Sequence, residues 1–174
     1  MIRFRRPASL KGCARAAIAG LCALAAVTAA APALAGEPPR AIDGPVSAEV
    51  IKVRDGDTIE VQAFVWPMQS VYVAVRIRGI DAPEKRGACE AEKAAAEIAT
   101  RRLEALVASG TVTLTGIKGD KYFGRVLADV ATETEGDVAE RLLRDGLVVP
   151  YGGDKRRDWC TELSESPNGA GSRG

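Results

Sequence analysis

Apolar and polar residues alternate along several stretches of the chain, and this period of two is typical of β-strands. The clearest stretch is 70–80, where one face carries Val71, Val73, Val75 and Ile77. The opposite face of that stretch carries Arg76 and Arg78. Four other segments alternate in the same way, at 48–53, 58–65, 111–117 and 125–132. The pattern therefore predicts five strands.

A period of three and four replaces this alternation between Cys89 and Val107, which predicts a long helix after the third strand. A shorter helix is predicted over 137–145, before Gly146. Five short strands interrupted by one helix fit a mixed α+β fold, a five-stranded Greek-key barrel of the OB type. An α+β sheet with helices on one face is the alternative.

The two ends of the chain differ from the part between them. Residues 1–35 combine a basic start, an Ala-rich apolar stretch and an A-x-A site, which predicts a signal peptide, with a membrane anchor as the alternative. Residues 36–46 are rich in Pro and Gly and predict a flexible lead-in. Folded structure is expected over 47–162, followed by a disordered tail at 163–174. An exported, periplasmic or secreted protein follows from this layout.

Charge and composition argue against several classes of function. The chain has 24 basic and 23 acidic residues, and 1–35 holds five basic and no acidic ones. The remainder is therefore slightly acidic, which argues against binding polyanions by bulk charge. The chain has no histidine, which excludes His-based general bases and His-ligated zinc.

Four cysteines occur, two of them, Cys13 and Cys22, within the predicted signal. Cys89 and Cys160 remain, and two cysteines in an exported chain indicate one disulfide. Two free thiols are the alternative.

Acidic residues at the strand ends are candidates for a cation site. Asp57 begins the second predicted strand and Asp81 follows the third, so an antiparallel pair of strands could bring them together. Carboxylate oxygens and a loop carbonyl such as that of Ala82 are ligands for hard cations. Glu84 follows directly. Asp57 taken singly is also an ordinary turn residue.

Arginines and a loop are candidates for phosphate and base contacts. Arg76 and Arg125 each offer a planar fork of donors that matches a phosphate, although either alone is also an ordinary surface charge. Lys121 and Tyr122 precede Arg125 in a predicted loop, where a cation and an aromatic ring could flank a base or sugar. An ordinary loop is the alternative.

Three blocks of sequence together resemble the staphylococcal nuclease (thermonuclease) family. They are VIKVRDGDTIEV at 50–61, VRIRGIDAPE at 75–84 and DKYFGRVLADV at 120–130, with a weaker block, DVAERLLRDGLVVPY, at 137–151. The resemblance implies an OB barrel with a helix after the third strand. It also implies hydrolysis of DNA or RNA with calcium, little sequence preference and 3′-phosphate ends.

The resemblance assigns a role to individual residues. It makes Asp57 and Asp81 calcium ligands with the carbonyl of Ala82, where the family often has Thr. It makes Arg76 and Arg125 phosphate-binding residues and Glu84 the carboxylate that activates water. Lys121, Tyr122 and Tyr151 are expected to contact substrate, although one residue more than in the family pattern separates Asp120 from Arg125. Cys89 and Cys160 match exported bacterial members with a disulfide.

Several expectations complete this picture. The nuclease is expected to be a monomer without a stable protein partner, and without membrane attachment once the signal is removed. The alternative function is a non-catalytic OB module that binds single-stranded nucleic acid or an envelope ligand. A degenerate nuclease kept for partner binding is a third interpretation, against which the complete set of acids and arginines argues.

Overall fold

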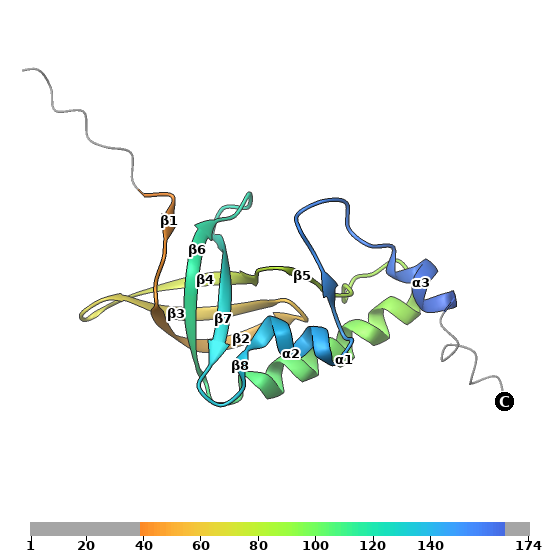
Figure 1. Cartoon of the computed structure of the whole chain (residues 1–174), viewed down its shortest axis with the longest axis horizontal. Coiled ribbons are helices and arrows are strands. Elements are labelled where there is room, and N and C mark those ends of the chain that lie inside the picture. The colour runs from red at the N-terminus through yellow and green to blue at the C-terminus, as the bar shows by residue number, and fades with distance from the viewer. Residues whose placement is uncertain (1–38, 166–174) are drawn as a thin grey trace, which may run out of the picture. The chain divides into compact units, whose positions relative to one another are not determined.

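Five strands close into a barrel in residues 39–165, the part of the chain that the computed structural model describes (Figure 1). The barrel strands are β2 (Val46–Asp55), β3 (Thr58–Trp66), β4 (Gln69–Ile77), β6 (Thr111–Gly119) and β7 (Arg125–Thr132). Their order is β6-β2-β3-β4-β7, and β6 pairs with β7 to close it. The pairing of β4 with β7 is parallel, and the others are antiparallel. The predicted barrel is confirmed.

Three helices and four short strands complete the described part. They are α1 (Glu90–Leu106), α2 (Val138–Arg144), α3 (Trp159–Glu165), β1 (Ala41–Ile42), β5 (Ile80–Asp81), β8 (Gly136–Asp137) and β9 (Val149–Pro150). The long helix after the third barrel strand and the short helix α2 agree with the prediction. Among residues 39–165, no helix has the length and apolar character needed to cross a membrane.

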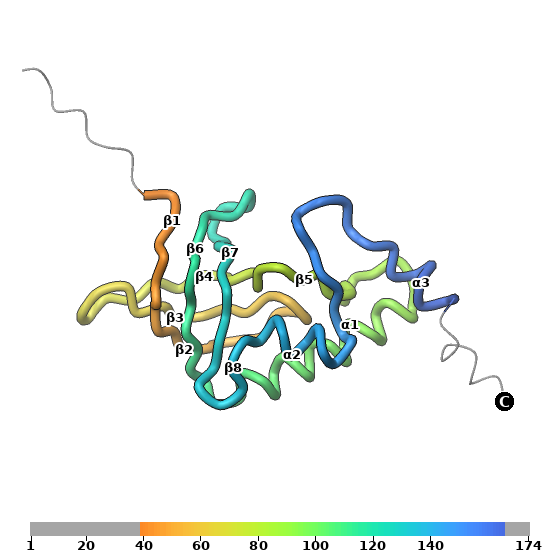
Figure 2. Tube along the Cα trace, viewed as in Figure 1, coloured from red at the N-terminus to blue at the C-terminus, as the bar shows by residue number. Residues whose placement is uncertain are grey.

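The core lies inside the barrel and under α1. Alternation along the strands turns Ile59, Val61 and Val75 inward, where all three are fully buried. Leu103 and Leu106 of α1 belong to the same cluster of buried side chains. The helix α1 packs on β2 and on α2, and α2 packs on β7, as the trace shows (Figure 2). The apolar stripe of α1 therefore packs against the buried side chains of the barrel strands.

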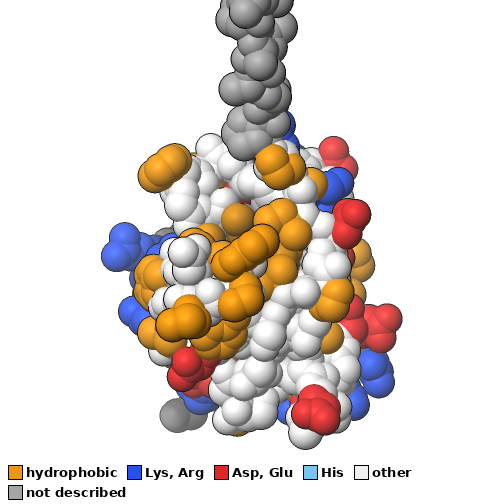
Figure 3. Space-filling model, turned by 90° about the vertical axis from the view of Figure 1, so that its left-hand side faces the viewer, with side chains coloured by type: hydrophobic (Ala, Val, Ile, Leu, Met, Phe, Trp, Pro, Cys, Tyr) orange, Lys and Arg blue, Asp and Glu red, His pale blue; other side chains and the backbone are white. Residues whose placement is uncertain are grey.

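The β3–β4 hairpin extends beyond the core. Its tip turns at Met68, which has a positive φ of 63°. Its exposed apolar side chains include Phe64, Val65, Trp66, Met68, Val71 and Tyr72. Figure 3 shows apolar side chains gathered on the face that carries this hairpin. Val71 belongs to the face predicted to point inward, but it is half exposed because the barrel ends before the hairpin does.

Ordered structure begins earlier than the sequence pattern predicts. Within the expected lead-in at 36–46, Ala41 and Ile42 form β1 and pair with Lys118 and Ile117, in the stretch of β6 that extends beyond its pairing with β2. A pairing of two residues is too short to produce a visible alternation, which is why the pattern misses it. The predicted signal at 1–35 and most of the predicted tail lie outside the described residues, and 163–165 belong to α3.

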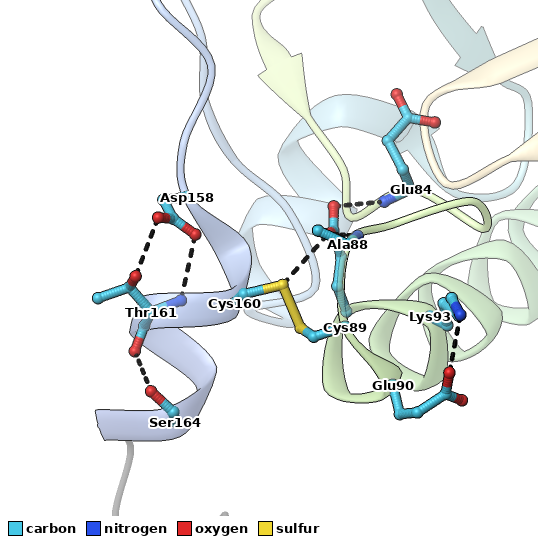
Figure 4. Close-up of a disulfide and its surroundings, with 10 residues drawn as sticks. Glu84, Ala88, Cys89, Glu90, Lys93, Asp158, Cys160, Thr161 and Ser164 are labelled. Carbon is cyan, nitrogen blue, oxygen red and sulfur yellow. Dashed lines mark hydrogen bonds and ion pairs between the residues drawn. A yellow bond between two sulfur atoms is a disulfide. The ribbon is translucent and has the colours of Figure 1, made fainter.

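A disulfide joins Cys89, the residue before α1, to Cys160 in α3, with a Cα–Cα distance of 5.9 Å (Figure 4). The predicted disulfide is confirmed and the alternative of two free thiols is wrong. The sequence does not predict α3 itself, because its seven residues are mostly polar and show no apolar stripe. The disulfide fixes this short helix against the start of α1.

Replacing both Cys89 and Cys160 by serine is expected to lower the free energy of unfolding by about 4 kcal/mol. The loop spans 71 residues, and closing a loop of that length removes this much entropy from the unfolded chain in the entropic description. Urea unfolding of the oxidised protein and the double variant measures the difference. The reduced wild-type protein is the control and should match the variant, whereas a loss below about 1 kcal/mol would contradict the expected effect.

Candidate active site

Strand pairing brings Asp57 to Arg76. Asp57 closes the tight turn between β2 and β3, and its neighbour Thr58 pairs with Arg76 of β4. Beyond β4 the chain turns at Gly79, whose φ of +80° favours glycine. This turn directs β5 back toward Asp57, so that Asp81 approaches the same arginine.

The carboxylate of Asp57 is almost completely buried and fully bonded. Its Oδ1 atom forms an ion pair with the Arg76 guanidinium and accepts a hydrogen bond of 2.9 Å from the Thr58 hydroxyl. Its Oδ2 atom accepts a hydrogen bond of 2.9 Å from the Ala82 backbone N–H. Asp57 therefore links the β2–β3 turn directly to the loop after β5.

Burial has an electrostatic consequence for Asp57. Desolvation raises its pKa to about 7, although the Arg76 guanidinium and the Ala82 N–H both act to lower it. One arginine therefore does not fully compensate the cost of placing this charge inside the protein. Further positive charge at these oxygens would stabilise the ionised form.

Asp81 is completely buried and accepts from three side chains. Its Oδ1 atom receives hydrogen bonds from Arg76, at 3.2 Å, and from Arg156, at 2.9 Å. Its Oδ2 atom receives one from the indole N–H of Trp159, at 3.2 Å. Two arginines from distant parts of the chain thus converge on one carboxylate oxygen.

Close backbone packing fixes this region against α1. A Cβ atom added to Gly56 would lie 2.8 Å from the Cβ atoms of both Ala82 and Ala99, which is too close for any side chain. Glycine in the β2–β3 turn therefore allows the loop after β5 and the helix to approach each other. The position of the Ala82 carbonyl depends on this contact.

Glu84 lies at the rim of the cluster, with its backbone held and its side chain accessible. Its N–H donates to Glu92 Oε1 at 3.2 Å, and Glu92 Oε2 accepts from Ala88 N at 3.0 Å (Figure 4). Glu92 is buried in the first turn of α1. The Glu84 side chain is 43% exposed, and its Oε1 atom lies 2.5 Å from Arg156 NH1.

Arg125 lies on the strand beside Arg76. Its register partner in the parallel β4–β7 pair is Ala74, two residues before Arg76, so the two arginines share one face of the sheet. In residues 39–165 its ion-pair partner is Asp120, with 2.5 Å between Nε and Oδ2. Its guanidinium also covers the Tyr122 ring, 4.5 Å from the centroid.

The three other predicted contact residues lie on two different segments. Lys121 and Tyr122 are in the β6–β7 turn, and the Lys121 ammonium lies 5.2 Å from the centre of the Tyr122 ring. Tyr151 follows β9; its N–H donates to Gly79 O at 2.8 Å and its hydroxyl donates to Asp154 O at 2.7 Å. Tyr122 thus accompanies Arg125, whereas Tyr151 lies beside the turn that leads to Asp81.

The structure therefore brings five predicted residues together, which we call the site cluster: Asp57, Arg76, Asp81, Ala82 and Glu84. The first four contact one another directly, and Arg156 links Glu84 to Asp81 and Ala82. Sequence reasoning missed Arg156, Trp159 and Glu92. The disulfide provides a signal for the first two, because joining Cys89 to Cys160 brings the residues just before each cysteine together. No comparable signal exists for Glu92 beyond its place in the first turn of the helix.

The oxygen atoms of the cluster fit a hard cation by their chemistry. The set consists of the carboxylates of Asp57 and Asp81 and the carbonyl of Ala82, and hard cations take such ligands. All three groups already accept from or pair with positively charged side chains. These oxygen atoms therefore stabilise positive charge placed between them.

Comparison with known proteins gives one match. A family model described as staphylococcal nuclease homologue matches residues 74–170, more than half of the chain. The matched range includes four members of the site cluster and Arg125, and it begins after Asp57. A search of curated protein sequences finds no match.

Proposed function

The chain belongs to the staphylococcal nuclease homologue family, which suggests a nuclease, and we propose that it is a calcium-dependent hydrolase of DNA or RNA. The observation that carries this proposal is the site cluster, in which a largely buried arginine and two buried carboxylates lie beside an accessible carboxylate. We further propose that cleavage has little sequence preference and leaves 3′-phosphate ends.

The two arginines are proposed to bind the phosphate. Arg76 and Arg125 share one face of the sheet, and a planar guanidinium can donate two parallel hydrogen bonds to phosphate oxygens. Arg125 is partly exposed and exchanges its bond with Asp120 for one with the substrate. Both charges would stabilise the negative charge that develops on the phosphoryl oxygens and on the leaving oxygen.

Glu84 is proposed as the general base. Its carboxylate is accessible at the rim of the cluster, and the bond between its N–H and Glu92 limits movement of its backbone. Glu84 takes a proton from water while the water oxygen bonds to phosphorus. The bond between phosphorus and the 5′ oxygen then breaks, the 5′ oxygen takes a proton from solvent, and the phosphate stays on the 3′ side.

Asp57, Asp81 and the carbonyl of Ala82 are proposed to hold calcium. Calcium supplies positive charge that offsets the charge of the substrate phosphate and helps to orient it. Burial of both carboxylates supports this role, because ionised carboxylates inside a protein require compensating charge.

Lack of base preference follows from where the proposed contacts fall. The two arginines and the cation site are proposed to contact phosphate, and phosphate contacts carry no sequence information. Lys121 and Tyr122, beside Arg125, and Tyr151, beside the turn to Asp81, are proposed to contact the neighbouring sugar or base. Removing the Tyr122 ring would weaken binding without changing which sequence is cut.

A second candidate function is a non-catalytic module that binds single strands or an envelope ligand. The exposed aromatic side chains of the β3–β4 hairpin, Phe64, Trp66 and Tyr72, favour it, because such rings stack on bases. Equilibrium binding without turnover distinguishes this candidate from the nuclease.

We also propose that the enzyme is exported and is either periplasmic or secreted. The disulfide supports it, because such bonds persist in oxidising compartments. We also propose that the protein acts as a monomer without a membrane attachment.

Removal of calcium is expected to abolish cleavage. The purified protein should cut single-stranded DNA with millimolar calcium, lose this activity in excess chelator, and regain it when calcium is restored. Loss of the cation leaves the phosphate charge uncompensated beside Asp81 and Glu84. The assay follows fragment length on a denaturing gel, with magnesium as the comparison ion, and undiminished cleavage in chelator would contradict the role of a cation.

A further inference from the structure

Arg156 lies on the oxygen atoms that the proposed function assigns to the cation. Its Nε atom donates to Asp81 Oδ1 at 2.9 Å, and its NH2 atom donates to the Ala82 carbonyl at 3.0 Å. Its NH1 atom lies 2.5 Å from Glu84 Oε1. One guanidinium therefore contacts two proposed cation ligands and the proposed base at once.

The segment that carries Arg156 is exposed but held at both ends. Residues 152–158 are all exposed and connect β9 to α3 at the end of the barrel where β5 lies (Figure 2). Before the segment, Tyr151 N donates to Gly79 O. After it, Trp159 contacts Asp81 and Cys160 is joined to Cys89. This tether keeps the guanidinium at a high effective concentration near the cluster.

The two arginines on Asp81 differ in how firmly they are placed. Arg76 extends from the middle of a barrel strand and its side chain is only 14% exposed. The Arg156 side chain is 42% exposed and extends from the exposed segment. Partial burial opposes it, but the carboxylates of Asp81 and Glu84 raise the pKa of Arg156 above its ordinary value, so its positive charge is permanent. Of these two arginines, Arg156 is the one that can leave without disturbing the barrel.

We propose that Arg156 is a built-in competitor of the cation, which must displace it from Asp81 and Ala82 before the site becomes active. This proposal rests on the proposed function. The other oxygen of Asp81 is already bonded to Trp159, so the cation and Arg156 need the same Oδ1 atom and the same carbonyl. Two positive groups in contact with the same oxygens repel each other.

Displacement of Arg156 also changes the surroundings of the Glu84 carboxylate. With Arg156 in place, the Glu84 carboxylate is held by the guanidinium, because its Oε1 atom lies 2.5 Å from Arg156 NH1 and is not free to approach a water molecule. Departure of Arg156 releases this carboxylate in the same step that opens the cation ligands. Cation entry and activation of the base are therefore one event, and the free enzyme is held inactive by its own C-terminal segment.

Calcium binding by an Arg156→Gln variant tests the competition without requiring catalysis. Trp159 contacts Asp81 and can sensitise terbium luminescence at the site, and calcium then competes for the bound terbium. Every protein in this experiment also carries Trp66→Phe. Of the two tryptophans of the chain, only Trp159 then remains to transfer energy to terbium. Arg102→Gln is the matched control, because Arg102 is similarly exposed but pairs with Asp145.

The expected result is calcium binding about tenfold tighter in Arg156→Gln, because the competent state is no longer partly blocked, and unchanged binding in Arg102→Gln. Equal or weaker binding in Arg156→Gln would overturn the competition alone and leave the cation site intact. Absence of binding in every protein would overturn the cation site, and this proposal with it.

Hydrogen exchange of the wild-type protein gives a second measurement that does not depend on any variant. Amides of 152–158 should exchange several-fold faster with saturating calcium than in chelator, because Arg156 no longer anchors the segment. Slower or unchanged exchange of this segment with calcium bound would overturn the proposal.

Discussion

Replacing Glu84 by glutamine is expected to slow phosphodiester cleavage by about two to four orders of magnitude, the usual contribution of a general base. Glutamine keeps the size of the side chain but cannot accept the proton of the attacking water. Cleavage rates at saturating calcium and substrate measure the effect. Residual activity within about tenfold of wild type would remove Glu84 as the base.

The fold should survive this change. The Glu84 side chain is partly exposed, and its pair with Arg156 at the rim is of the kind that contributes at most about 1 kcal/mol. Glu97→Gln, an equivalent change at an exposed position of α1, is the matched control and should leave both rate and stability unchanged. An equal loss of rate in both variants would point to a general effect on the protein.

Replacing Arg76 by alanine is expected to lower the free energy of unfolding by about 3–5 kcal/mol when a chelator is present. Removing one partner of a buried ion pair leaves the other charge uncompensated, and here Asp57 and Asp81 both lose a partner. Calcium should restore part of the stability, because it compensates the same carboxylates. Urea unfolding with and without calcium measures both effects.

Arg54→Ala is the control for Arg76. Arg54 pairs with Glu60 but its side chain is half exposed, so its loss should cost at most about 1 kcal/mol and should not respond to calcium. An equal cost in the two variants, or an Arg76→Ala protein that calcium does not stabilise, would contradict the electrostatic account of the cluster.

The barrel could be predicted from the sequence because the alternation of apolar and polar residues is visible within each strand. Alternation along 58–65 and 125–132 predicts β3 and β7 almost to the residue, and the apolar stripe predicts α1. The five strands, the long helix and the disulfide are confirmed. The strand pairing that brings Asp57 to Arg76 follows from the turn between β3 and β4, which the sequence indicates by Pro67.

The C-terminal part of the site could not be predicted in the same way. Arg156 approaches Asp81 across 75 positions of sequence, held by a seven-residue helix and by a two-strand pairing of β5 with β9. Neither element is long enough to show a periodic pattern. Three consecutive basic residues in a polar segment, Lys155 to Arg157, have the composition of a solvated loop, and only the disulfide places them beside the cluster.

The central claim is that the site cluster hydrolyses phosphodiesters and leaves the phosphate on the 3′ side, and analysis of product ends tests it most directly. Single-stranded DNA labelled at its 5′ end is incubated with the purified protein and calcium, and the fragments are then treated with a phosphatase that removes 3′-phosphates. The account predicts labelled fragments whose mobility changes after this treatment. Labelled DNA that remains intact, or fragments whose mobility the phosphatase leaves unchanged, would contradict it.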